Sequence, residues 1–331
     1  MPSIREFGKG KTMKVALTGA TGFIGKYIAR EFMKPGDAVR ALVRPTSDVA
    51  FLKSGGAELV TGDFGDDAAM QALIRGADAL VHNGYWHDRN ELQEPMKWFE
   101  LNVLSSLKML EWCRRAGVRR YLFISTGAVY GEKGVRPLLC EAPSGPTGKR
   151  GLTPFSQPLD EMTGAFPRGG YAAYNRAVEV YVDAYRGEFD MAGSTSIRLC
   201  GRNIGVHRKL DMCPWLDLLR AGLRGDDLRV SGMDQFDCCV DIARNLRLLL
   251  TKPMEKVEEV YCFADDARPM REIAEALVRG LGSRSRVIEE PAREGFVGTS
   301  NARLKAAGGT FSGPAGIEAY AREMLPILKS R

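Results

Sequence analysis

The sequence predicts an α/β protein built on a doubly wound parallel sheet, with a smaller C-terminal lobe interleaved with it. Short apolar runs end at turn residues, and helical patterns separate most of them. A glycine-rich turn follows the first run. Strands that alternate with helices at this spacing form parallel sheets covered on both faces, because each parallel connection needs a crossover helix.

The expected elements follow in chain order. Apolar runs that end at Gly, Pro, Asp or Arg predict strands at 14–18, 38–43, 58–61, 79–82, 121–125, 194–199 and 260–263. Apolar residues at helical spacing predict helices at 23–34, 95–116, 171–185, 214–223, 240–250 and 269–281.

Composition narrows the possible functions. The chain has 331 residues, of which 44% are hydrophobic and 27% charged, as in ordinary globular proteins. Its net charge of +6 is dispersed, so we expect no nucleic-acid partner, although an anionic small molecule would suit it. No apolar run approaches the roughly 18 residues of a membrane span, and 1–12 lacks a signal-peptide core, so no membrane association and a cytoplasmic location are expected. The seven cysteines form no C-x-x-C pair and predict no metal site.

The turn after the first predicted strand reads Thr-Gly-Ala-Thr-Gly-Phe-Ile-Gly over 18–25. Gly19 permits the tight turn, Gly22 lets backbone N–H groups approach a pyrophosphate, and Gly25 allows close packing of the helix on the sheet. The helix N-terminus behind the turn favours an anion. The spacing therefore predicts the phosphate-binding loop of a dinucleotide site.

Together with this loop, four later segments resemble the extended short-chain dehydrogenase/reductase family. They are VHNGYW at 81–86, FISTGAVYG at 123–131, VYCFADDARPMREIAEAL at 260–277 and NARLKAAG at 301–308. The family includes sugar-nucleotide epimerases and dehydratases and dihydroflavonol-reductase-like enzymes. The resemblance implies a Rossmann fold that holds NAD or NADP.

The resemblance also implies how the chain is divided. We expect a flexible tail over 1–12 and an NAD(P)-binding domain over 13–190, which also takes strands from about 194–200 and 258–264. Residues 201–331 would form mainly a substrate-binding lobe. The Gly-, Pro-, Ser- and Lys-rich stretch 132–170 is too long for a plain connection and predicts a functional loop or an insertion.

By resemblance, the cofactor lies against residues from several strand ends. A carboxylate that would hold the NAD ribose is expected at the end of the second strand, but Val43 stands there and the cation Arg44 follows, which favours NADP. The implied cofactor residues are Gly19, Thr21, Gly22, Phe23, Ile24, Gly25, Arg44, Asp63, Phe64, Asn83, Gly84, Tyr85 and Ser125.

The family transfers protons with a Ser or Thr after the fifth strand and a Tyr-x-x-x-Lys on the next helix. Thr126 and Tyr171 match the hydroxyl positions, but Asn175 stands where the lysine belongs. Asn175 can still bond the ribose, but it cannot supply positive charge. The phenol should therefore be roughly 1–3 pKa units harder to ionise than in a complete site.

Three interpretations stay open at this point. In the first, Tyr171 is the acid/base and Asn175 holds the ribose. In the second, another group carries the proton, and the candidates are Glu141, Asp160, Glu161 and His87. In the third, the chain is a catalytically silent dinucleotide-binding protein, such as a sensor or a partner-binding module, that has lost the Tyr-Lys pair.

The substrate side departs from the sugar-nucleotide pattern. Gly127-Ala128 replaces the Asp-Glu of 4,6-dehydratases, and Asp234 stands where epimerases often hold an arginine for the diphosphate. A smaller sugar or a sugar-like hydroxylated compound is therefore an alternative to a sugar nucleotide as the expected substrate. The residues expected to contact the substrate are Trp86, His87, Gly127 and Asn203.

The sequence thus predicts an NAD(P)-dependent oxidoreductase or epimerase that acts on a secondary alcohol or carbonyl of a sugar or sugar-like small molecule. The resemblance also implies a homodimer formed by two helices. Apolar and aromatic side chains recur at helical spacing on these two helices. Either a dimer contact or core packing within one subunit would explain this spacing. The residues concerned are Leu107, Leu110, Trp112, Val178, Val182 and Tyr185.

Overall fold

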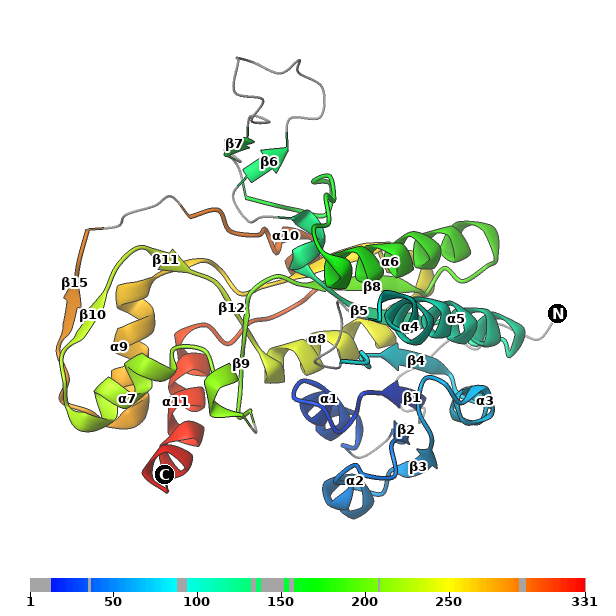
Figure 1. Ribbon diagram of the computed structural model, residues 1–331, viewed down its shortest axis with the longest axis horizontal. Coiled ribbons are helices and arrows are strands. Elements are labelled where there is room, and N and C mark those ends of the chain that lie inside the picture. Colours follow the sequence, from blue (N-terminus) through cyan, green and yellow to red (C-terminus); the bar gives the residue numbers. More distant parts are fainter. Residues whose placement is uncertain are drawn as a thin grey trace.

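A computed structural model describes residues 13–34, 37–87, 94–131, 135–137, 152–154, 158–207, 209–291 and 296–330. Its centre is a seven-stranded sheet in the order β13-β8-β5-β4-β1-β2-β3, with every neighbouring pair parallel (Figure 1). The strands are β1 (Lys14–Thr18), β2 (Ala38–Val43), β3 (Glu58–Thr61), β4 (Ala79–His82), β5 (Tyr121–Thr126), β8 (Thr195–Leu199) and β13 (Val260–Phe263). The predicted fold class is confirmed.

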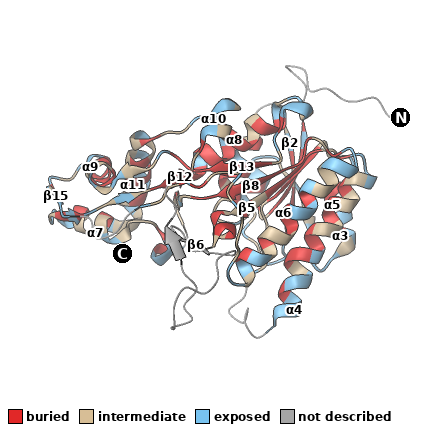
Figure 2. Ribbon diagram, turned by 90° about the horizontal axis from the view of Figure 1, so that it is seen from above, coloured by how far each residue is buried: buried red, intermediate tan, exposed pale blue. Residues whose placement is uncertain are grey.

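Helices cover both faces of this sheet, and each face has its own apolar core (Figure 2). Alternate residues of β1 supply the two cores, with Val15 and Leu17 on one face and Ala16 on the other. The first face packs against α1 (Gly25–Phe32), α2 (Ala50–Ser54) and α8 (Cys239–Thr251). The second packs against α3 (Asp67–Ile74), α5 (Ser105–Arg115) and α6 (Gly170–Glu188).

The strand order fixes where a ligand can bind. β1 pairs with β2 on one side and with β4 on the other, so the chain order reverses between β1 and β4. Helices that lead away from a reversal point cross to opposite faces and leave a crevice at the carboxyl ends of the strands. The loops after β1, β2 and β4 meet there.

The predicted helix 95–116 is not continuous. It begins as α4 (Pro95–Trp98), passes through a π-helical turn at Phe99–Leu104, and continues as α5. Trp98 is completely buried at the start of this turn. Wide turns of this kind commonly occur at functional sites, and a spacing argument from sequence cannot detect one.

The C-terminal lobe lies beside the carboxyl end of the sheet (Figure 1). Its helices α7 (Leu216–Arg224), α9 (Met270–Leu281) and α11 (Pro314–Lys329) share a third apolar core. Short strands pair within it: β9 (Arg202–Ile204) with β12 (Phe236–Cys238), β10 (Leu228–Val230) with β15 (Val287–Glu289), and β11 (Met233–Asp234) with β14 (Arg268–Pro269). The remaining helix, α10 (Ala302–Ala306), packs near β13.

Part of the predicted 132–170 loop is described. Strands β6 (Val135–Pro137) and β7 (Leu152–Pro154) pair antiparallel and project away from the sheet (Figure 1). The tail 1–12 and Glu141 lie outside the described residues. Within the described part of the chain, no helix has the length and apolarity needed to cross a bilayer.

Candidate functional site

The glycine-rich turn connects β1 to α1 at the crevice. Gly19 has a φ of +69°, and a Cβ there would lie 2.8 Å from the Asn83 carbonyl oxygen. A Cβ on Gly25 would lie 1.9 Å from the Gly19 oxygen, so α1 can begin here only with glycine. The N–H groups of Lys26 and Ile28 donate to the carbonyl oxygens of Gly22 and Ile24, so it is the positive end of the helix dipole that favours an anion here.

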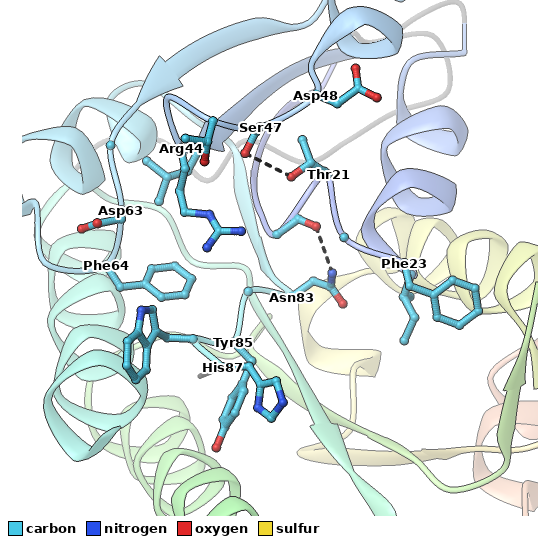
Figure 3. Close-up of a pocket in the computed structure, with 18 residues that line it drawn as sticks. Thr21, Phe23, Arg44, Ser47, Asp48, Asp63, Phe64, Asn83, Tyr85 and His87 are labelled. Carbon is cyan, nitrogen blue, oxygen red and sulfur yellow. Dashed lines mark hydrogen bonds between the residues drawn. The ribbon is translucent and has the colours of Figure 1, made fainter. Parts of the chain in front are cut away.

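A cavity of about 480 Å³, the larger cavity, opens in front of this turn (Figure 3). Its walls come from the loops after β1, β2, β3 and β4. Among the predicted residues, those that line it are Gly19, Thr21, Gly22, Phe23, Ile24, Arg44, Asp63, Phe64, Asn83, Gly84, Tyr85, Trp86 and His87. The residues expected to hold a cofactor therefore meet in one place, except Gly25 and Ser125, which do not line this cavity.

Arg44 provides the positive charge of the larger cavity, and its guanidinium points into the hollow (Figure 3). Thr46 and Ser47 follow it in the same wall, and the Thr21 hydroxyl lies 3.5 Å from the Ser47 hydroxyl. A cation flanked by hydroxyl groups at the end of β2 suits a phosphate, because all of these groups can donate hydrogen bonds.

Two expected substrate contacts, Trp86 and His87, line the larger cavity. Both rings pack edge-on against Trp98, with centroids 5.2 and 5.7 Å away. The buried Trp98 side chain thus contacts two residues of the loop after β4, and this loop shares the cavity wall with the loop after β2. The third, Gly127, packs against Cys200, 3.0 Å from where its Cβ would lie, and lines neither of the two cavities.

Behind the cavity floor, His82 ties β4 to its neighbours. Its ring nitrogens lie 2.7 Å from the Thr18 hydroxyl and 2.8 Å from the Ser106 hydroxyl. The Thr18 oxygen also accepts the Gly84 N–H at 2.9 Å. Burial lowers the pKa of His82 from 6.5 to about 3. This histidine holds the loop in place and carries no charge at neutral pH.

The buried imidazole predicts an acid-sensitive stability. Below pH 6.5 the unfolded chain binds a proton on His82 that the folded chain does not, so unfolding becomes easier by about 1.4 kcal/mol per pH unit until about pH 3. The unfolding free energy of His82→Gln, measured in urea, should lack this decrease with falling pH between pH 4.5 and 6.5. His207→Gln, at a partly exposed site, is the control. An unchanged slope in His82→Gln would contradict the assignment.

A smaller cavity of about 160 Å³ adjoins the larger one, and Ile24, Asn83, Gly84 and Tyr85 line both. It lies at the carboxyl end of β5 beside the first turns of α6. Ser125, Thr126, Tyr171, Asn175 and Asn203 are the predicted residues along its other walls.

Tyr171 and Thr126 both line the smaller cavity. The Tyr171 ring packs edge-on against Tyr85, with centroids 5.0 Å apart, and the residue stays 43% exposed. Desolvation raises the pKa of Tyr171, and the nearby Thr126 hydroxyl only partly opposes this. The phenol is thus protonated at neutral pH.

Asn175 is buried one turn after Tyr171, and its side-chain nitrogen donates to the Tyr171 carbonyl oxygen at 2.8 Å. One of its amide hydrogens is therefore committed to the helix. The next residue, Arg176, donates instead to Glu179 at 3.0 Å. Neither residue supplies a cation to the Tyr171 hydroxyl.

The pair Glu179 and Arg198 lies behind Ser125 and was not singled out from the sequence. Arg198 donates to both Glu179 oxygens at 3.0 and 2.9 Å, and both side chains are buried. The Ser125 hydroxyl, in the wall of the smaller cavity, donates to the same carboxylate at 2.6 Å. The sequence feature that could have indicated this pair is Arg198, because it is a charged residue inside a predicted apolar strand.

The alternative proton carriers are engaged elsewhere. Asp160 accepts the Thr163 hydroxyl at 2.8 Å, and Glu161 accepts the Cys262 N–H at 2.7 Å. Neither lines the smaller cavity, and His87 lines the larger one. Within the described chain, Tyr171 is therefore the titratable group best placed to transfer a proton.

The six apolar residues considered for a dimer contact pack within one subunit. Leu110, Val178 and Val182 are buried in the core between α5 and α6, with Leu107, Trp112 and Tyr185 against it. Core packing accounts for their spacing. Dimerisation therefore stays a prediction from resemblance.

The fold and the two cavities define a Rossmann-type α/β protein with a glycine-rich turn between β1 and α1. The model of the NAD dependent epimerase/dehydratase family matches residues 15–212, which is more than half of the chain. The chain belongs to this family, as its motifs predicted.

Individual relatives agree with this assignment. A UDP-glucose 4-epimerase of Streptomyces lividans is 32% identical over 153 residues, covering 45% of this chain and 46% of that protein. Sterol demethylase protein B of Methylococcus capsulatus is 33% identical over 130 residues, covering 38% and 37%. The chain thus spans less than half the length of these relatives. The UDP-glucose 4-epimerase of Thermus thermophilus, solved with NAD, shares the fold with a TM-score of 0.66 at 22% identity over 93% of this chain and 98% of that one.

Proposed function

We propose that this protein is an NADP(H)-dependent oxidoreductase that interconverts a carbonyl and a secondary alcohol on a sugar or a sugar-like small molecule. The observation that carries the proposal is the Tyr171–Thr126 hydroxyl pair in a cavity continuous with the phosphate loop. Stereochemical inversion, as in the related epimerase, would need oxidation and reduction in one site. The neutral Tyr171 favours net reduction instead.

The residues present fit a dinucleotide. Added Cβ atoms on Gly19, Gly25 or Gly84 would meet neighbouring atoms at 2.8, 1.9 and 2.2 Å, so only glycine fits at these positions. With no side chains there, a pyrophosphate can approach the backbone of the turn. Arg44 would hold the 2′-phosphate of NADP, and Phe64 would lie beside the adenine. When bound, the reduced cofactor supplies a hydride.

In the reductive direction, Thr126 and Tyr171 hydrogen-bond the substrate carbonyl oxygen, and Tyr171 donates its proton to that oxygen. Burial keeps the phenol protonated, and the described wall residues of the smaller cavity include no cation that would stabilise a phenolate. Solvent then returns a proton to Tyr171. The oxygen of Asn175 is the group that remains to accept a ribose hydroxyl.

Arg44→Ala tests the choice of cofactor. Loss of the guanidinium should weaken NADPH binding about 10- to 100-fold, since a charge-assisted bond to a phosphate contributes about 1.5–3 kcal/mol. NADH binding should stay within about twofold, because NADH carries no 2′-phosphate. Fluorescence titration of both cofactors checks this, with Lys53→Ala on the exposed side of α2 as the control. Equal losses for both cofactors would refute the NADP assignment.

A catalytically silent dinucleotide-binding protein is the second candidate. The observation that favours it is Asn175 at the lysine position, with part of its amide committed to the helix. A panel of ketones and aldehydes with NADPH separates the two candidates. Steady NADPH oxidation supports the oxidoreductase, whereas tight NADPH binding without turnover supports the silent protein.

A further inference from the structure

The smaller cavity contains no charge among its described wall residues. Its polar lining consists of hydroxyl and amide groups, and the remainder is apolar or aromatic. The nearest buried carboxylate noted above, Glu179, is covered by Ser125 and neutralised by Arg198 and Arg176. An anion placed beside Tyr171 would therefore lose its hydration without gaining an ionic partner, which costs several kcal/mol.

The cation next to Asn203 in the chain is not available either. Arg202 stands next to Asn203 in β9, but its guanidinium pairs with Asp234. The same carboxylate accepts the Trp215 indole N–H at 3.1 Å. Trp215 has a φ of 56°, a conformation that is costly for a bulky residue and that this bond helps to hold. Arg202 and Asp234 thus form a neutral pair with a structural role.

His207 is also turned away from the smaller cavity. Its Nδ1 lies 3.0 Å from the Lys209 N–H, which donates to it, and its ring packs edge-on against Phe23 with centroids 4.7 Å apart. The ring does not line the smaller cavity. This side chain is committed to the contact between the lobe and the phosphate loop.

Asn203 offers the smaller cavity a hydrogen-bond acceptor instead of a cation. It lines the smaller cavity, and its buried side-chain oxygen has no hydrogen-bond partner among the residues that the structure describes. A buried carbonyl oxygen without a donor costs about 1–3 kcal/mol, so a bound ligand that donates a hydrogen bond would recover this energy. An anionic acceptor group would be repelled by it.

We propose that the substrate is an uncharged carbonyl compound that carries a hydroxyl or amide N–H donor near its carbonyl, and that Asn203 accepts the hydrogen bond from this donor. The inference rests on the proposed oxidoreductase function and specifies its substrate class. It excludes oxo acids and other compounds with a negative charge beside the reacting carbonyl as good substrates. Asn203 is then a specificity-determining residue and has no part in proton transfer.

The test uses probes that differ only in charge and donor capacity. Phenylglyoxylamide and phenylglyoxylate have nearly the same shape, but the first is neutral with N–H donors and the second is an anion. Calorimetric titration of the NADP-loaded protein should give at least tenfold tighter binding of the amide. Equal or tighter binding of the acid, or no binding of the amide, would each overturn the proposal.

The variant Asn203→Leu keeps the side-chain volume but removes the acceptor. It should weaken amide binding about tenfold, corresponding to one hydrogen bond, and leave NADPH affinity unchanged. Undiminished amide binding in this variant would overturn the role of Asn203. Failure of the proposed function would look different: NADPH would not bind, or the amide would bind without any NADPH oxidation.

Discussion

Replacing Tyr171 with Phe should lower the rate of carbonyl reduction about 10²- to 10⁴-fold, the range expected when a positioned proton donor is removed. The affinity for NADPH should not change, because the phenol lies in the smaller cavity and the phosphate loop and Arg44 in the larger one. Stopped-flow measurement of NADPH oxidation at saturating cofactor gives the rate directly.

The matched control for this variant is Tyr174→Phe. Tyr174 lies three residues further along α6 and lines the same cavity, but its hydroxyl donates to the Pro95 carbonyl oxygen at 3.2 Å. Its loss should change the rate less than about threefold. Full activity in Tyr171→Phe, or equal losses in both variants, would contradict Tyr171 as the proton donor.

The companion variant Asn175→Lys tests the same assignment through pH. Burial raises the pKa of Tyr171, so alcohol oxidation, which needs the phenolate, should rise with pH past neutrality in the natural protein. A lysine one turn along the helix should lower this pKa and shift the oxidation profile to lower pH by about 1–3 units. Reduction at neutral pH should gain little, because the phenol is already protonated. An unmoved profile would indicate another proton carrier.

Most of the sheet was predictable because its strands, apart from the edge strand β3, are buried on both faces. Such strands appear as continuous apolar runs, and the runs at 38–43, 79–82 and 260–263 coincide with β2, β4 and β13. The short lobe strands were not predictable. β11 and β14 have two residues each, too few for any period, and they form because α7, α9 and α11 bring distant segments together.

The candidate site likewise has features that the sequence predicts and features that it does not. Local motifs were enough to identify the phosphate loop and the Thr126–Tyr171 pair, because the turn geometry and the helical spacing place these groups. The position of Trp86 and His87 was not predictable, since it depends on Trp98, a buried residue from a different element. The commitment of Ser125 to Glu179 likewise depends on a contact between β5 and α6 that sequence spacing does not specify.

Glu179→Ala should destabilise the protein by about 3–5 kcal/mol, the effect of leaving one partner of a buried ion pair without its counter-charge. Arg198 would keep its charge in the core, with only its bond to the Tyr130 hydroxyl at 2.8 Å. The Ser125 hydroxyl would lose its acceptor as well. Urea unfolding followed by fluorescence measures the change. Glu111→Ala, which breaks ion pairs with the exposed Arg114 and Arg115, should have little effect.

The double variant Glu179→Leu with Arg198→Met separates charge from packing. Apolar side chains of similar length often replace a buried ion pair without loss of stability, because the cost of desolvating two charges disappears. The double variant should therefore be at least about 2 kcal/mol more stable than Glu179→Ala. If it is as unstable as Glu179→Ala, the pair stabilises the fold through its geometry, because Ser125 and Tyr130 depend on its hydrogen bonds. If Glu179→Ala itself unfolds like the natural protein, the carboxylate does not neutralise Arg198 in solution.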